Sequence, residues 1–214
     1  MLITTLPLEI FIEIFKYIEE DYETLYSCVL VNKKWHNINI PTLWRNLLIF
    51  KNSIKILINC LLEEYKNFLV ENDIVLKDFE LLEKSPLYNY AKFTTELDFY
   101  EINECLENLC DIVSLKYLKT RLEEFILDHS NIRKLKILDS EELLDHHRFD
   151  ACFQNLHELY CFMHSSSKFI DKLATTCKNI QVLNIDCYFN PDYSVTEFFS
   201  LTELIKLIKA QNPN

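Results

Sequence analysis

The 214-residue chain contains no glycine. Phosphate-binding loops of the P-loop and dinucleotide-binding classes need backbone conformations that glycine adopts most readily, so the sequence excludes both classes. The Gly-x-Ser-x-Gly turn of α/β-hydrolases is excluded for the same reason. Helices must also end without the usual glycine cap. We expect asparagine to serve at several helix ends, the candidates being Asn32, Asn155, Asn179 and Asn212.

Two further absences concern location and partners. No apolar run approaches the roughly 18 residues of a membrane span, and residues 1–5 lack the basic region and apolar block of a secretory signal. The formal net charge is −11, and no run of lysine and arginine compensates it, which disfavours nucleic-acid binding. We therefore expect an intracellular protein, cytoplasmic or nuclear, that binds neither membranes nor nucleic acid.

The eight cysteines form no Cys-x-x-Cys pair. Most lie within apolar patterns, so we expect buried free thiols in a reducing compartment and no zinc site or other cofactor. His146 and His147, near Asp145 and Asp150, have the residue types of a metal or acid–base site, but a solvated helix face is the preferred interpretation. No cysteine, histidine or serine lies in a catalytic pattern, and we do not expect an enzyme.

What the chain does contain is apolar material for a core, with 15 phenylalanines and 11 tyrosines. Residues 6–20 have apolar side chains three to four apart and predict an amphipathic helix with Pro7 in its first turn. Asp21 is expected to cap a second helix, and a third segment at 32–39 is expected to stop at Pro41. A short helix opening at Thr42 and another at 53–65 follow, whereas residues 66–93 are less periodic.

From about residue 94 the pattern changes to short strands alternating with helical runs. An apolar-x-x-apolar-x-apolar motif starts at Ile132, Leu156 and Ile180, so successive copies are 24 residues apart. This step lies within the range of leucine-rich repeats, in which strand–helix units stack into a curved parallel sheet with helices outside. An earlier unit is expected around Leu97 and Phe99, with a helix near 103–119. The run 122–127 resembles another strand but breaks the register, and the sequence leaves its role open.

Helices are expected between the strands at 141–153 and 168–178, and a last one at 197–210. A further strand is due after that helix, yet the sequence ends at Asn214. We expect either a chain shorter than its relatives or another surface covering the edge of the strand at 180–187.

The N-terminal segment resembles an F-box. The resemblance is carried by Leu6-Pro7-x-Glu9-Ile10-x-x-x-Ile14-Phe15-x-x-Ile18, then by Leu25-x-x-x-Val29-x-Val31-Asn32-Lys33-Lys34-Trp35, and finally by Pro41-x-Leu43-Trp44-Arg45. The whole chain is also similar to the large fungal group of F-box proteins with degenerate leucine-rich repeats. That wider likeness is carried by residues 85–93 and by the ending at 204–211.

The resemblance implies two regions with separate binding roles. An all-α F-box at residues 1–50 would bind the Skp-type adaptor of a cullin-based ubiquitin ligase. After a helical region at 51–93, an irregular α/β leucine-rich-repeat solenoid at 94–214 would hold an unknown target protein. The other hypothesis is a repeat scaffold without ligase function and with a vestigial F-box. An exposed apolar patch around Leu6, Pro7, Ile10 and Trp35 would favour the ligase reading, and burial of those residues the scaffold.

Carried onto this sequence, the adaptor contacts are Leu6, Pro7, Ile10, Ile14, Phe15, Val31, Trp35 and Trp44, with Glu9 positioning the first helix. Phe11, Ile18, Val29 and Ile38 are assigned to the F-box's own core, and Trp35 fits either role. The expected target surface is the concave side of the sheet, at Glu158, Tyr160, Asn184 and Asp186, because these alternate with core positions. Its acidic members suggest a basic target.

Overall fold

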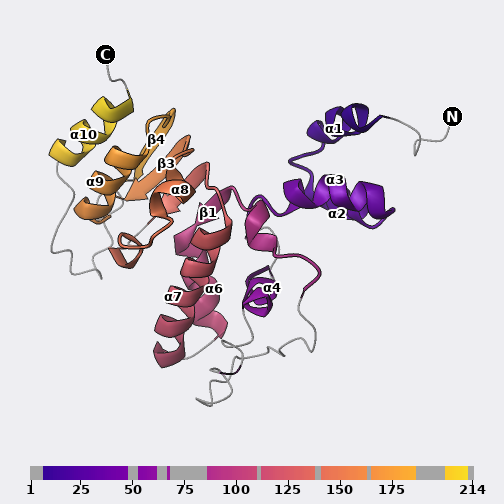
Figure 1. Ribbon diagram of the computed structural model, residues 1–214, viewed down its shortest axis with the longest axis horizontal. Coiled ribbons are helices and arrows are strands. Elements are labelled where there is room, and N and C mark those ends of the chain that lie inside the picture. Colours follow the sequence, from indigo (N-terminus) through magenta and orange to yellow (C-terminus); the bar gives the residue numbers. More distant parts are fainter. Residues whose placement is uncertain are drawn as a thin grey trace.

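The computed structural model describes residues 7–47, 53–61, 67, 86–109, 112–137, 141–162, 165–186 and 201–211. Three short helices lie at the N-terminal end, and a small parallel sheet flanked by helices makes up most of the rest (Figure 1). The chain is thus a mixed helix and sheet protein. No helix in the described ranges combines the length and the apolarity needed to cross a membrane.

The N-terminal helices are α1 (Leu8–Lys16), α2 (Tyr22–Val29) and α3 (Lys33–Leu43). The side chain of Asp21 accepts a hydrogen bond from the Thr24 N–H and caps α2, as predicted. Asn32 caps the start of α3 by accepting from the Trp35 N–H, so its predicted role at a helix end is wrong. The predicted stop at Pro41 is also wrong, because α3 continues through Pro41 to Leu43.

The strands are β1 (Glu96–Asp98), β2 (Lys134–Ile137), β3 (Glu158–Phe162) and β4 (Val182–Asp186). They form one parallel sheet in the order β1-β2-β3-β4. Lys134 pairs with Glu158, and Glu158 with Val182, so the 24-residue step found in the sequence sets the register of the last three strands. β1, which contains Leu97, is the earlier and less regular unit and pairs with β2.

One backbone hydrogen-bond motif recurs at the entry to every strand. The carbonyl of Arg133 accepts from the N–H groups of His157 and Glu158, and the carbonyl of His157 accepts from Gln181 and Val182. At the entry to β2, the carbonyl of Thr95 accepts from the N–H groups of Arg133 and Lys134. At the entry to β1, the carbonyl of Arg45 accepts from those of Thr95 and Glu96. Asn46 also forms a parallel bridge with Glu96. The end of the N-terminal helical region is therefore joined to the first strand by main-chain bonds.

The helices beside the sheet are α6 (Phe99–Leu109), α7 (Ile112–His129), α8 (Phe149–Phe153), α9 (Ser167–Thr176) and α10 (Leu201–Gln211), with short 3-10 turns η2 (Tyr90–Phe93) and η3 (Glu141–Leu143). α4 (Ser53–Cys60) lies near α6 (Figure 1). The segment 122–127 lies inside α7, so it is helix and not an additional strand. Leu122, Ile126 and Leu127 are fully buried there, spaced as one helical face requires.

One continuous core runs from α2 to α10 and includes Leu25, Trp44, Leu135, Leu159 and Leu207. A second, small cluster lies between α1, α2 and α3. α10 packs on α9, and the Gln211 side chain accepts from the Ile180 N–H and donates to the Cys177 carbonyl. These bonds fasten the last described helix to the start of the β4 unit.

Candidate functional site

The first helix is too apolar for one buried face. Six of the nine residues of α1, LEIFIEIFK, are large and apolar, yet only Phe11 and Phe15 are buried. A helix that is apolar around most of its circumference normally needs cover on more than one side. The described part of this chain covers one side.

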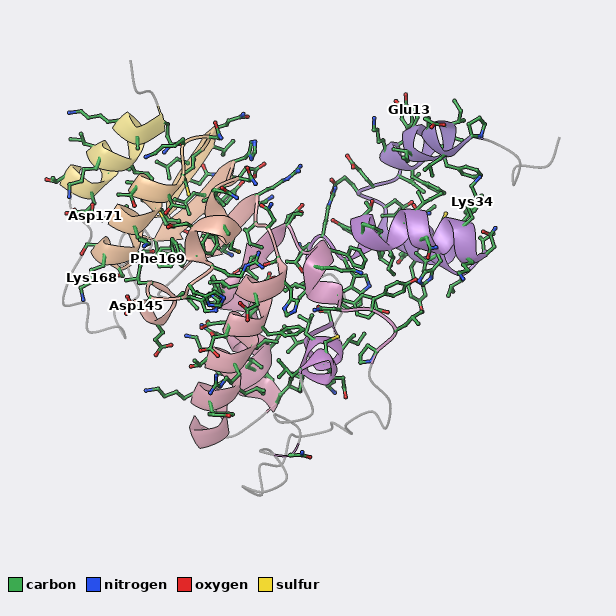
Figure 2. All side chains as sticks on the ribbon, viewed as in Figure 1. Glu13, Lys34, Asp145, Lys168, Phe169 and Asp171 are labelled. Carbon is green, nitrogen blue, oxygen red and sulfur yellow. The ribbon has the colours of Figure 1, made fainter. Side chains whose placement is uncertain are left out.

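Phe11, Phe15 and Cys28 form the small cluster that holds α1 against α2 and α3. The Trp35 ring, half-buried, meets both phenylalanines edge-on, with ring centroids 5.8 Å and 5.3 Å apart. The Lys34 ammonium lies 4.3 Å from the Phe11 ring centroid. Figure 2 shows Glu13 on the side of α1 that faces away from α3, where it pairs with Lys16. The cluster fixes the orientation of α1, and so of its exposed side chains.

The aliphatic side chains of α1 that lie outside this cluster are exposed to nearly the same extent: Leu8 48%, Ile10 47%, Ile12 45% and Ile14 46%. On a helical projection Ile10 and Ile14 share one flank with Tyr17, which is 84% exposed. Leu30 and Val31 are exposed at the end of α2. Leu8 and Ile12 lie on the opposite flank of α1, beyond the buried Phe11 and Phe15. We call these seven side chains the apolar surface; exposed apolar side chains in this number indicate an interaction site.

The predicted adaptor contacts divide into two groups. Pro7, Glu9, Ile10, Ile14 and Val31 are exposed and reachable by a partner. Trp35 is half-buried, and Leu6 lies outside the described residues.

The assignment of Phe15 and Trp44 as adaptor contacts is corrected by the structure, because both side chains are buried within the chain. Phe15 belongs to the small cluster, and Trp44 to the main core, where its ring stacks on Tyr90 with centroids 4.1 Å apart. In this conformation neither can contact an adaptor. Of the residues assigned to the F-box core, Phe11 and Val29 are buried, and Ile18 and Ile38 are half-buried.

Sequence reasoning missed Leu8, Ile12, Tyr17 and Leu30. Leu8 and Ile12 could have been found from the sequence, because six large apolar residues in a nine-residue helix are more than one buried face needs. Tyr17 and Leu30 lie at helix ends, where periodicity gives no direction. Their exposure could be learned only from the packing.

The residues of the expected target surface lie together on one face of the sheet. Tyr160 pairs in register with Asn184, and Phe162 with Asp186, while Glu158 is one pleat earlier on β3. Neighbouring strands carry opposite charges on this face: Lys134 lies 3.6 Å from Glu158, and Lys136 lies 3.0 Å from Asp98. Taken alone, the four predicted residues suggest an acidic surface, but the two lysines neutralise much of that charge.

Two cavities open along this face. One, of about 360 Å³, is lined by residues that include Asp98, Lys136 and Tyr160. The other, of about 440 Å³, is lined by residues that include Arg45, Arg133 and His157. Arg45 also lies 3.4 Å from Glu19 and 3.3 Å from Glu96. Its guanidinium therefore joins the helical region to the edge of the sheet beside the second cavity.

Comparison with known proteins identifies one domain. Residues 3–49 match the model of the F-box-like family. No curated protein and no solved structure matches the chain. The matched segment contains α1, α2, α3 and the whole apolar surface, so the exposed side chains belong to an F-box-like domain.

Proposed function

We propose that this protein is a substrate-receptor subunit of a Skp-cullin-F-box ubiquitin ligase. In this role the apolar surface of the F-box-like domain binds the Skp-type adaptor, and through it a cullin. The observation that carries the proposal is the exposure of Ile10 and Ile14 on a helix held rigidly by its own small core.

The energetics favour an apolar partner. Complete burial of an isoleucine side chain contributes about 1.5–3 kcal/mol. Ile10 and Ile14 are roughly half exposed, so covering each adds on the order of 1 kcal/mol. Several such residues around a half-buried tryptophan have the composition of an interface core.

We further propose that the sheet and its helices are a short leucine-rich-repeat array whose exposed face holds the target protein. The 24-residue register and the recurring bonds at Arg133 and His157 support this assignment. Because charges of both signs alternate across the face, a target of mixed charge fits better than a purely basic one. We infer a binding role without catalysis of its own.

The test is co-purification of the full chain with a Skp-type adaptor, wild type against the double variant Ile10→Asp/Ile14→Asp. The variant should keep the helical circular dichroism of the wild type, since both side chains are exposed, and should lose the adaptor. Ile208→Asp is the matched control: Ile208 is 49% exposed on α10, outside the F-box-like domain. It should bind as the wild type does.

Stoichiometric binding that only the double variant loses supports the proposal. If well-folded wild-type protein leaves the adaptor unbound, the ligase role is overturned, and the repeat scaffold with a vestigial F-box replaces it. Equal loss in Ile208→Asp would show that the surface has been assigned to the wrong end of the chain.

A further inference from the structure

Three side chains distant from the apolar surface converge behind the sheet. Asp128 lies near the C-terminal end of α7, and His146 and His147 lie on the segment between η3 and α8. Asp145, on the same segment, is labelled in Figure 2. The Nε2 atoms of His146 and His147 lie 3.7 Å and 3.5 Å from the same oxygen, Oδ1 of Asp128. One ligand atom from each of the three residues falls within 4.8 Å of the other two.

This is a different cluster from the one the sequence suggested. Asp150 accepts a hydrogen bond from the Thr176 hydroxyl instead, and Asp145 is exposed and outside the cluster. The carboxylate that faces both histidines comes from α7, a preceding helix. His147 is 74% exposed, as expected for a solvated face, whereas the His146 side chain is only 10% exposed.

The two nitrogen–oxygen distances are close to an edge of a metal tetrahedron. Zinc binds imidazole nitrogen and carboxylate oxygen at about 2.0–2.2 Å. Two ligands at that distance in tetrahedral geometry lie about 3.4 Å apart. The two nitrogen–oxygen distances of 3.5 Å and 3.7 Å need only a small contraction to reach this value.

Direct hydrogen bonding accounts for the arrangement less well. Nitrogen–oxygen hydrogen bonds lie between about 2.7 and 3.2 Å, and both contacts are longer. Oδ1 of Asp128 is shielded from solvent and has no hydrogen-bond partner. A buried carboxylate oxygen without a partner is costly, and a cation between it and the two rings would satisfy it.

The surroundings allow a metal to enter and be held. His147 is 74% exposed, which leaves the fourth position open to water. Nδ1 of His146 accepts from the Arg148 N–H at 3.3 Å. Binding through Nε2 places the imidazole proton on Nδ1, so this long contact is given up. The set of two imidazoles and one carboxylate suits zinc and neighbouring first-row divalent ions.

We propose that Asp128, His146 and His147 bind one Zn²⁺ ion, with water as the fourth ligand. The ion joins the end of α7 to the segment that leads into α8, and so stabilises the packing of two successive helical units. The proposal is independent of the ligase role, because none of the three residues belongs to the F-box-like domain or to the exposed face of the sheet.

The test is isothermal titration calorimetry of the full metal-free chain with Zn²⁺, wild type against His147→Ala and Asp128→Asn. Loss of groups that merely orient ligands costs about 10–100-fold in metal affinity. Removing a ligand itself should therefore weaken binding by at least about 10-fold. His129→Ala is the matched control, because His129 is exposed on the last turn of α7 and belongs to no such cluster among the residues that the structure describes. It should bind zinc as the wild type does.

Co²⁺ titration supplies a second readout. A tetrahedral nitrogen and oxygen site gives visible d–d bands without a sulfur-to-cobalt charge-transfer band. Zinc should also raise the melting temperature of the wild type, reversibly with a chelator, and leave that of His147→Ala unchanged.

One saturable ion per chain, lost in both ligand variants and kept in His129→Ala, supports the site. Absence of saturable binding overturns it. So does binding that survives His147→Ala and Asp128→Asn, or a sulfur charge-transfer band, which would assign the metal to the cysteines. Circular dichroism of each variant separates loss of a ligand from loss of fold.

Discussion

Glu123 lies on α7 among buried leucines and isoleucines, with 0% of the residue exposed. Neither carboxylate oxygen has a hydrogen-bond partner, and the Lys119 ammonium is 3.9 Å away. Burial raises the pKa of Glu123 from its ordinary value of 4.5 to about 7, while Lys119 opposes the rise and Glu142 and Glu124 add to it. We predict that Glu123→Gln stabilises the protein above neutral pH.

The magnitude follows from linkage. A pKa that is higher by one represents about 1.4 kcal/mol, so the ionised form of Glu123 is disfavoured by about 3 kcal/mol in the folded state. Between pH 4.5 and 7 the folded chain binds this proton more tightly than the unfolded chain does. The contribution of Glu123 to stability therefore falls as the pH rises through that window, and stays constant above it.

Urea denaturation at pH 4.5 and at pH 8 measures the effect. Glutamine has the shape of the neutral carboxyl, so the free energy of unfolding of Glu123→Gln should differ little from wild type at pH 4.5. At pH 8 it should exceed wild type by up to about 3 kcal/mol. Groups that titrate alike in wild type and Glu123→Gln cancel in the difference between the two proteins.

Glu124→Gln is the matched control on the same helix. Glu124 is partly exposed and pairs with Arg121 at 2.7 Å. Loss of this pair should cost at most about 1 kcal/mol, and the same substitution removes a carboxylate that raises the pKa of Glu123, so its net effect should be small at both pH values. A difference between wild type and Glu123→Gln that is the same at both pH values would refute the reasoning, since only ionisation of Glu123 can make it depend on pH.

Two further predictions concern the core. Trp44→Ala should lower the free energy of unfolding by about 3–5 kcal/mol in urea denaturation, because the ring is buried against Tyr90. Weaker adaptor binding with unchanged stability would contradict the assignment of Trp44 to the core. Burial raises the pKa of Cys161 and Cys177 to about 12. Both thiols should therefore resist alkylation at pH 8 in the native protein and react after denaturation, as measured by mass spectrometry. Rapid labelling of either thiol in the native protein would contradict the packing.

The strand positions could be predicted because their cause is local. β2, β3 and β4 each present an apolar residue inward at alternate positions, Leu135 and Ile137, Leu159 and Cys161, and Leu183 and Ile185, and the 24-residue step places the same pattern on the next strand. The run 122–127 misled for the same reason, because six apolar-rich residues fit a strand or a buried helix equally well. Only its place within α7 decides the matter.

The sites were less predictable because they depend on partners distant in the sequence. Trp44 matches the F-box pattern, but its burial depends on Tyr90, which lies beyond the matched segment. Asp128 and the two histidines belong to different elements, and no spacing rule connects them. The apolar surface was predicted in part: Ile10, Ile14 and Val31 fit the F-box pattern, whereas Leu8 and Ile12 were missed although the excess of apolar residues in this short helix is visible in the sequence.

The junction at Arg45 bears on how the proposed receptor would present its target. The main-chain carbonyl of Arg45 accepts from the N–H groups of Thr95 and Glu96 at 2.9 Å and 2.8 Å, in the same pattern as at the entries to the later strands. Leu25 and Trp44 share one buried core with the strands. The end of the F-box-like domain is therefore joined to the first strand by main-chain hydrogen bonds and shares its core. On the proposed function, an adaptor bound to α1 fixes the direction in which the sheet presents its target.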